Sequence, residues 1–137
     1  MSTPSATPGS GWVEIIGRAT AEAFASAFTE QVLLETSAGS KAIAGAAAIR
    51  RFFDATRGMY DSIVFVHETA TELRIHLEWE GVFQGAPIAG ATILTRDAGG
   101  KIDRIRLYHR PYEQVIAFSA ELARRLDGQM ETGIFHP

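Results

Sequence analysis

The sequence contains no cysteine. That absence excludes disulfide frameworks, thiolate zinc sites, iron–sulfur clusters and thiolate nucleophiles. The sequence also lacks a strong excess of one charge, because 13 basic residues are balanced by 16 acidic ones and neither kind forms a long run. Binding to a phosphate backbone needs a basic patch, so we expect no nucleic-acid partner.

Long hydrophobic runs are missing as well. No stretch approaches the ~20 apolar residues of a transmembrane helix, so we expect no membrane partner. Residues 1–11 are rich in Ser, Thr, Pro and Gly and lack the charged and hydrophobic segments of a secretory signal. We interpret them as a disordered lead-in and expect a cytoplasmic location. No phosphate-cradling glycine loop or other cofactor-binding motif is visible, so no cofactor is expected. The sequence also lacks the Gly-x-Ser-x-Gly motif of a hydrolase nucleophile elbow.

What is present fits one globular domain, because the 137 residues are 46% hydrophobic and 21% charged. Apolar residues at three- and four-residue spacing predict a helix over 12–28, which Gly17 either bends or splits. A short strand is predicted at 32–36, a loop at 37–45 and a second helix over 46–60.

The second half of the chain has the alternating pattern of strands. Short turns separate these strands, so neighbouring strands are expected to pair antiparallel. The predicted strands are 62–69, 72–83, 87–96 and 101–110. In the second of them one face carries Leu73, Ile75, Leu77, Trp79 and Phe83. A third helix over 112–126 and an irregular tail over 128–137 complete the chain.

This order of elements predicts an α+β fold: a cone-shaped, curved antiparallel sheet wrapped around the N-terminal helices, plus a C-terminal helix. Residues 12–127 form the single domain. A strongly curved sheet leaves space on its concave side, so we expect a pocket there.

Two segments carry a resemblance to a known family. The run over 28–36, FTEQVLLET, is followed by Gly45 and by the helix segment AIRRFF over 48–53. Together with the element order over 12–111 and the closing strand that ends at Pro111, this pattern resembles the nuclear transport factor 2-like superfamily. That group includes ketosteroid isomerases and SnoaL-like polyketide cyclases. The resemblance implies a cone with a deep apolar cavity, usually in a dimer.

The residues that the isomerases of this family use are replaced here. The resemblance places their general-base aspartate at Thr36, their helix-one tyrosine near Trp12 and their protonated aspartate near Thr92. A threonine hydroxyl does not titrate near neutral pH, and an indole donates a hydrogen bond but accepts none. We therefore expect that the protein is not a true ketosteroid isomerase.

His109 is the best remaining catalytic candidate. Its parity places it with Ile105 and Leu107 on the apolar face of the last strand. Imidazole is the usual acid or base at neutral pH, with a reference pKa of ~6.5. The alternative is a histidine that only hydrogen-bonds a neighbour or lies at the solvated end of the strand.

The other predicted site residues have side chains that do not titrate near neutral pH. Thr36 and Thr92 are predicted to orient a ligand oxygen or His109, and the alternative is simple strand packing. Trp12 is predicted to offer its N–H to the pocket, or else to belong to the core. The predicted cavity walls are Phe52, Tyr60, Leu77, Trp79, Leu94, Ile105 and Leu107.

Charged residues are expected outside the pocket. Glu35 precedes Thr36, so it points away unless the strand slips by one residue. Carboxylates on the second predicted strand share a sheet face with arginines of the last strand, which suits either solvation or a two-fold homodimer contact through the outer sheet face. The four histidine side chains are predicted to point in different directions and do not converge, so no metal site is expected.

These observations leave two main hypotheses for the function. The first is an isomerase, cyclase or hydratase acting on a small apolar carbonyl compound, with His109 as acid or base. The alternative is a non-catalytic binder of a small apolar molecule, or a dimeric accessory module.

Overall fold

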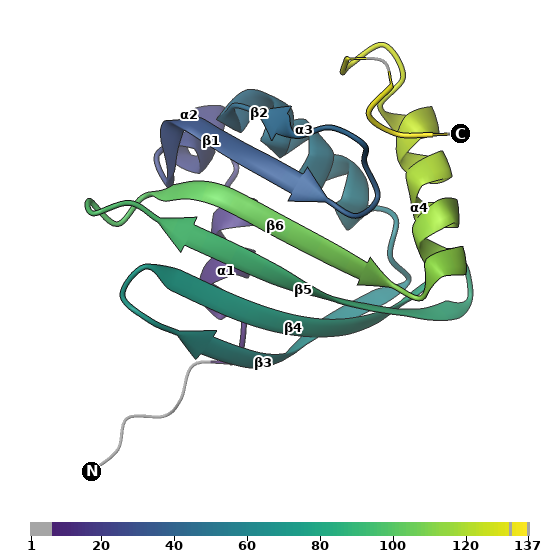
Figure 1. The fold of residues 1–137 in the computed structure, drawn as a ribbon, viewed down its shortest axis with the longest axis horizontal. Helices are drawn as coiled ribbons and strands as arrows, with labels where there is room; N and C mark the ends of the chain where they lie inside the picture. The colour runs from purple at the N-terminus through teal and green to yellow at the C-terminus, as the bar shows by residue number, and fades with distance from the viewer. Residues whose placement is uncertain (1–6, 132, 137) are drawn as a thin grey trace.

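A computed structural model describes residues 7–131 and 133–136. The chain folds into one six-stranded sheet with helices, as Figure 1 shows, and the predicted α+β class is confirmed. In chain order the elements are α1 (Ser10–Ile16), α2 (Ala21–Ala25), β1 (Phe28–Thr36), β2 (Ile43–Ala44), α3 (Ala46–Arg57), β3 (Ser62–Ala70), β4 (Arg74–Phe83), β5 (Ala86–Arg96), β6 (Ile102–Arg110) and α4 (Tyr112–Arg125).

The N-terminal helical region is split at Gly17, which is one of the two outcomes that the sequence left open for the helix over 12–28. Helix α1 ends at Gly17, the residue that the sequence marked as a bend or break. Helix α2 then restarts because the Thr20 hydroxyl accepts a hydrogen bond from the Ala23 N–H at 3.1 Å, as an N-cap does. The expected helix also ends too late, since Phe28 already belongs to β1.

Helix α1 begins two residues before the predicted start, inside the segment interpreted as a lead-in. Gly9 has a φ of +78°, which only glycine adopts readily, and this conformation turns the chain into the helix. The Gly9 N–H donates to Glu68 Oε1 at 2.9 Å. Residues 10 and 11 therefore belong to the folded domain, and residues 1–6 lie outside the described part.

The sheet has the order β2-β1-β6-β5-β4-β3. Strands β3 to β6 form the predicted antiparallel meander. Strand β1 lies parallel to β6, with Thr36 opposite Leu107, so the whole sheet is mixed. The loop predicted over 37–45 contains the two-residue strand β2, which is too short to show an alternating pattern.

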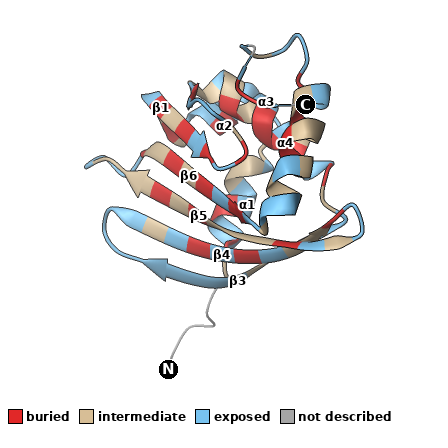
Figure 2. Cartoon of the chain, turned by 45° about the vertical axis from the view of Figure 1, so that its right-hand side comes forward, coloured by how far each residue is buried: buried red, intermediate tan, exposed pale blue. Residues whose placement is uncertain are grey.

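Helices α1 and α3 lie on the concave side of the sheet, and Figures 1 and 2 show the strands curving around them. The core side chains of the central strands point to this side, among them Leu77 and Trp79 of β4. Leu73, which was expected on the same face, lies in the turn before β4 and is 52% exposed.

The C-terminal segment closes one end of the cone. Helix α4 begins after Pro111, and Phe118 on it packs against Phe83 at a ring distance of 5.1 Å. The tail beyond α4 is irregular, as predicted, but it is part of the core: Ile134 and Phe135 are buried, and Phe135 stacks on Phe52 at 6.0 Å. The described helices are too short or too polar to cross a membrane. A cytoplasmic location stays a prediction.

Candidate functional site

An apolar cavity of about 290 Å³ lies on the concave side of the sheet between α1 and α3. We call it the central cavity. Aromatic and aliphatic side chains from both helices and from β3 to β6 form most of its wall. Its lining residues are Trp12, Val13, Ile16, Gly17, Phe53, Thr56, Arg57, Tyr60, Ile63, Phe65, Trp79, Thr92 and Leu107.

Few polar groups reach the central cavity. Thr92 on β5 is 2% exposed and contributes a hydroxyl to the wall. The Thr56 hydroxyl is used within α3, where it donates to the Phe53 carbonyl at 3.2 Å. Arg57 lies at the helix end, donating to the Ile16 carbonyl and pairing with a carboxylate on its own helix. None of the described lining residues is Asp or Glu, so the cavity holds no carboxylate base.

His109 is buried next to the central cavity but does not line it. The side chain is 8% exposed, and its ring packs against Trp79 at 5.3 Å and Phe118 at 4.8 Å. Its Nε2 lies 3.4 Å from the Tyr60 hydroxyl, and Tyr60 is a wall residue of the cavity. His109 therefore contacts the cavity wall through Tyr60 and Trp79, and Tyr60 is the wall residue that it meets with a ring nitrogen.

Burial sets the protonation of both groups. Removal from water disfavours the charged imidazolium and lowers the pKa of His109 to about 4. The same effect disfavours the phenolate and raises the pKa of Tyr60 well above its usual range. At neutral pH the pair is an uncharged imidazole beside a phenol that keeps its proton.

Ser37 is the site residue that sequence reasoning missed. Its hydroxyl lies 3.3 Å from His109 Nδ1 and accepts a hydrogen bond from the His109 backbone N–H at 2.9 Å. The contact spans 72 residues and depends on the parallel pairing of β1 with β6, which no pattern in the sequence indicated. The neighbouring Thr36 accepts a hydrogen bond from the Ala38 N–H at 3.1 Å and does not line the central cavity.

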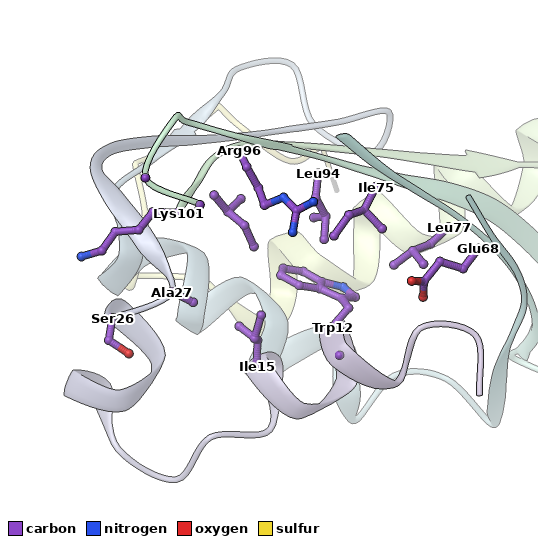
Figure 3. A pocket seen from close by; sticks show the side chains of 14 residues that line it. Trp12, Ile15, Ser26, Ala27, Glu68, Ile75, Leu77, Leu94, Arg96 and Lys101 are labelled. Atoms are coloured by element: carbon purple, nitrogen blue, oxygen red, sulfur yellow. The ribbon is translucent and has the colours of Figure 1, made fainter. Parts of the chain in front are cut away.

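The structure divides the other predicted site residues among three places. Trp12, Tyr60, Trp79, Leu107 and Thr92 line the central cavity. Leu77 and Leu94 instead line a second cavity, which Figure 3 shows and to which Trp12 also contributes.

Two of the expected wall residues belong to the solid core. Phe52 is fully buried under Phe53 and Phe135, and Ile105 is fully buried in β6. Neither lines either of the two cavities.

Trp12 is the partition between the two cavities. Its indole is 4% exposed and meets Phe53 edge-to-face at a centroid distance of 5.3 Å. Gly90 on β5 makes room for the other tryptophan, because a Cβ there would lie 2.5 Å from the Trp79 ring. The two indoles thus define the width of the concave space.

Glu35 points away from the cavity, as predicted. Its Oε1 lies 3.4 Å from Nε of both Arg104 and Arg106 on the outer face of β6. This facing excludes it as a base for a ligand in the central cavity. Among the described residues no group of three or more His, Asp or Glu side chains is placed to hold a metal ion.

Comparison with solved structures identifies the architecture. A steroid delta-isomerase from Pseudomonas aeruginosa superposes with a TM-score of 0.76, over 86% of this chain and 88% of that one, at 18% identity. This is the nuclear transport factor 2-like fold.

Other solved structures are also similar to this chain over most of its length. A conserved bacterial protein with a cystatin-like fold from Silicibacter pomeroyi matches with a TM-score of 0.76, at 16% identity, over 85% of this chain and 82% of that one. A candidate isomerase of the SnoaL-like family from Agrobacterium tumefaciens matches with a TM-score of 0.54, at 14% identity, over 73% and 92%. No protein-family model and no curated protein matches the sequence.

Within the nuclear transport factor 2-like fold, two of the three positions that the resemblance assigned to catalysis reach the central cavity. Trp12 and Thr92 line it, and Thr36 does not. The site is therefore an apolar cavity whose wall contains the Thr92 hydroxyl and Tyr60, with the neutral His109 behind Tyr60.

Proposed function

We propose that the central cavity binds a small, mostly apolar organic molecule that carries one carbonyl or hydroxyl oxygen. The observation that supports this most is the composition of the wall, which is aromatic and aliphatic apart from the Thr92 hydroxyl and the helix-end groups. Ligand pockets in proteins are typically about 300–1,000 Å³ and mostly apolar, with a few placed polar groups. A volume of about 290 Å³ favours a ligand of one or two rings.

The binding free energy would come from two sources. Apolar contact contributes roughly 25 cal/mol per Å² removed from water. A hydrogen bond from the ligand oxygen to Thr92 adds about 1 kcal/mol and fixes the orientation of the ligand. Apolar contact gives affinity for many compounds, and the hydrogen bond to Thr92 selects those that place an oxygen near β5.

Intrinsic fluorescence tests this proposal, because both tryptophans of the chain, Trp12 and Trp79, line the central cavity. Titration with the bicyclic ketone 1-decalone is expected to change the emission and to saturate. Thr92→Val keeps the shape and removes the hydroxyl, so its Kd should rise about fivefold.

The matched control is Thr95→Val on the same strand, since Thr95 lies on the outer face opposite Arg74 and Arg104. It should leave the Kd unchanged. Equal effects of the two substitutions, or no saturable change in emission, would contradict the proposal.

The contact between His109 and Tyr60 favours a second candidate, an isomerase, cyclase or hydratase acting on a carbonyl compound. In this mechanism a carbon next to the carbonyl loses its proton to the Tyr60 oxygen, while the Tyr60 proton moves to His109 Nε2, 3.4 Å away. The neutral imidazole is free to accept it. Thr92 would hydrogen-bond the oxygen that becomes negative.

Deuterium exchange separates an enzyme from a binder. The protein is mixed with 1-decalone in D₂O, and proton NMR follows loss of the signals next to the carbonyl. The catalytic candidate predicts exchange faster than in buffer, with loss of the acceleration in Tyr60→Phe while 1-decalone still binds. Exchange at the buffer rate with saturable binding leaves the cavity as a non-catalytic binding site.

We also propose a homodimer through the outer face of the sheet. Small side chains of β5, Ala89 and Ala91, pair with acidic residues of β4 on one side and with Arg110 and Tyr108 of β6 on the other. Glu80 pairs across to Ala89, and Ala89 pairs across to Arg110. A two-fold axis along β5 would set Glu80 of one copy against Arg110 of the other, which is a self-complementary arrangement.

A further inference from the structure

A second cavity of about 320 Å³ lies at the end of the sheet where the β3–β4 and β5–β6 turns meet α1 and α2. We call it the hairpin-end cavity, and Figure 3 shows it from close by. Its apolar walls are Trp12, Ile15, Ile75, Leu77, Leu94 and Ile102. We propose that this cavity binds a small amphipathic carboxylic acid, with the apolar chain against these walls and the carboxylate at Arg96 and Lys101.

Arg96 supplies a fixed and incompletely used cation. Its Nη2 donates to the carbonyls of Thr71 and Glu72 at 3.1 and 3.2 Å, which holds the guanidinium against the β3–β4 turn. Its Nε is buried and has no hydrogen-bond partner among the described residues. A buried donor without a partner is unfavourable, so an acceptor in the cavity would remove that cost.

Charge as well as hydrogen bonding favours an anion here. Within the part of the chain that the structure describes, neither Arg96 nor Lys101 has a carboxylate within ion-pair distance. Lys101 lies on the β5–β6 turn, whose shape is fixed by a hydrogen bond from the Lys101 N–H to Asp97 Oδ1 at 2.9 Å. Two unpaired cations therefore border one apolar cavity, and a carboxylate accepts hydrogen bonds from both kinds of donor.

A carboxylate at the other end of the cavity would determine the orientation of the ligand. Glu68 borders the cavity there, and its Oε1 already accepts the Gly9 N–H. In Figure 3 the Glu68 carboxylate and the Lys101 ammonium lie at opposite ends, with Trp12 between them. A carboxylate head is repelled at the Glu68 end and attracted toward Arg96 and Lys101.

This ligand class differs from that of the central cavity, because the one cation among the described residues that line it, the helix-end Arg57, is paired with Asp54. The inference therefore does not depend on the function proposed for the central cavity. The two cavities share only Trp12.

Three probes with the same eight-carbon chain test the inference by isothermal titration calorimetry on the full-length protein at low salt. Octanoate is expected to bind about tenfold more tightly than 1-octanol, because a charge-assisted hydrogen bond contributes about 1.5 kcal/mol or more. Octylammonium is expected to bind more weakly than 1-octanol. Octanol binding as tight as octanoate would overturn the assignment of an acid-binding site.

Substitutions then locate the head group. Lys101→Met removes a cation whose side chain makes no hydrogen bond within the described part, so the fold stays intact, and octanoate should bind several-fold more weakly with octanol unaffected. Arg96→Met should have the larger effect. The control is Arg74→Met, which removes a positive charge from the same end of the sheet on the outer face. An equal loss in Arg74→Met and Lys101→Met would show a general charge effect and refute the site.

Gly11→Leu locates the apolar chain. Gly11 lines the hairpin-end cavity, and a Cβ there meets nothing within 4 Å, so a side chain can start from this position without a clash. It should weaken octanoate and octanol alike and leave 1-decalone in the central cavity unaffected. Unchanged octanoate binding in Gly11→Leu would place the acid elsewhere and contradict the proposal.

Discussion

At the scale of single residues, His109 shows how burial determines the available chemistry. The ring is enclosed by Trp79 and Phe118, and its nitrogens contact the hydroxyls of Ser37 and Tyr60. Hydroxyl partners stabilise a neutral imidazole, and no carboxylate is among these contacts to stabilise the charged form. The imidazole is therefore uncharged at neutral pH in the free protein.

The lowered pKa of His109 predicts a pH dependence of stability. The unfolded chain binds a proton at His109 near pH 6.5, while the folded protein binds it only near pH 4. Stability is therefore complete above the unfolded pKa and is lost as pH falls from about 6.5 toward 4. Urea unfolding should give about 2 kcal/mol less free energy of unfolding at pH 5 than at pH 8 from this group.

His109→Asn should remove that part of the pH dependence, whatever its effect on absolute stability. His76→Asn is the control, because His76 is exposed on the outer face. If His109→Asn and the unmodified protein lose the same free energy between pH 8 and pH 5, the burial account of His109 is wrong.

The facing of single residues was largely predictable, and their long-range partners were not. Period-two alternation placed Glu35 outward and His109 inward, because parity along a strand is a local property. The contact of Ser37 with His109 joins β1 to β6, and only the pairing of these strands brings the two residues together.

At the scale of elements, the N-terminal helices show that hydrophobic periodicity alone does not locate a break in a helix. One apolar stripe runs through 12–28, so hydrophobic periodicity alone predicts one helix. The break is made by backbone chemistry instead: Gly17 ends α1 and the Thr20 cap starts α2. The break lets α1 lie across the concave side of the sheet, where Trp12 separates the two cavities.

Thr20→Ala tests the role of the cap. Loss of the hydroxyl leaves the Ala23 N–H without its partner, and the free energy of unfolding should fall by about 1 kcal/mol. Thr20→Ser keeps the acceptor and should behave as the unmodified protein in the same urea titration. A loss equal in both variants would show that the methyl group, and not the cap, is responsible.

At the scale of the whole molecule, the fold was predictable and the division of its interior was not. Element order and two short motifs indicated the nuclear transport factor 2-like architecture, since these are properties of chain order. The separation of Leu77 and Leu94 from the central cavity depends on where one indole lies. Periodicity assigns a side chain to a face, but it does not show which space on that face the side chain borders.

The proposed homodimer predicts a charge-reversal rescue. Glu80→Arg places like charges against Arg110 of the second copy, so sedimentation velocity should show a shift from dimer to monomer. Adding Arg110→Glu restores opposite charges and should restore the dimer. A monomeric unmodified protein, or a dimer insensitive to Glu80→Arg, would contradict an interface along β5.

The most direct test of the central claim is a crystal structure of the protein with 1-decalone. We predict electron density for the ketone between Trp12 and Trp79, with its oxygen within hydrogen-bond distance of Thr92 Oγ1. A central cavity that stays empty at saturating ketone, or a ketone bound only outside it, would contradict the account.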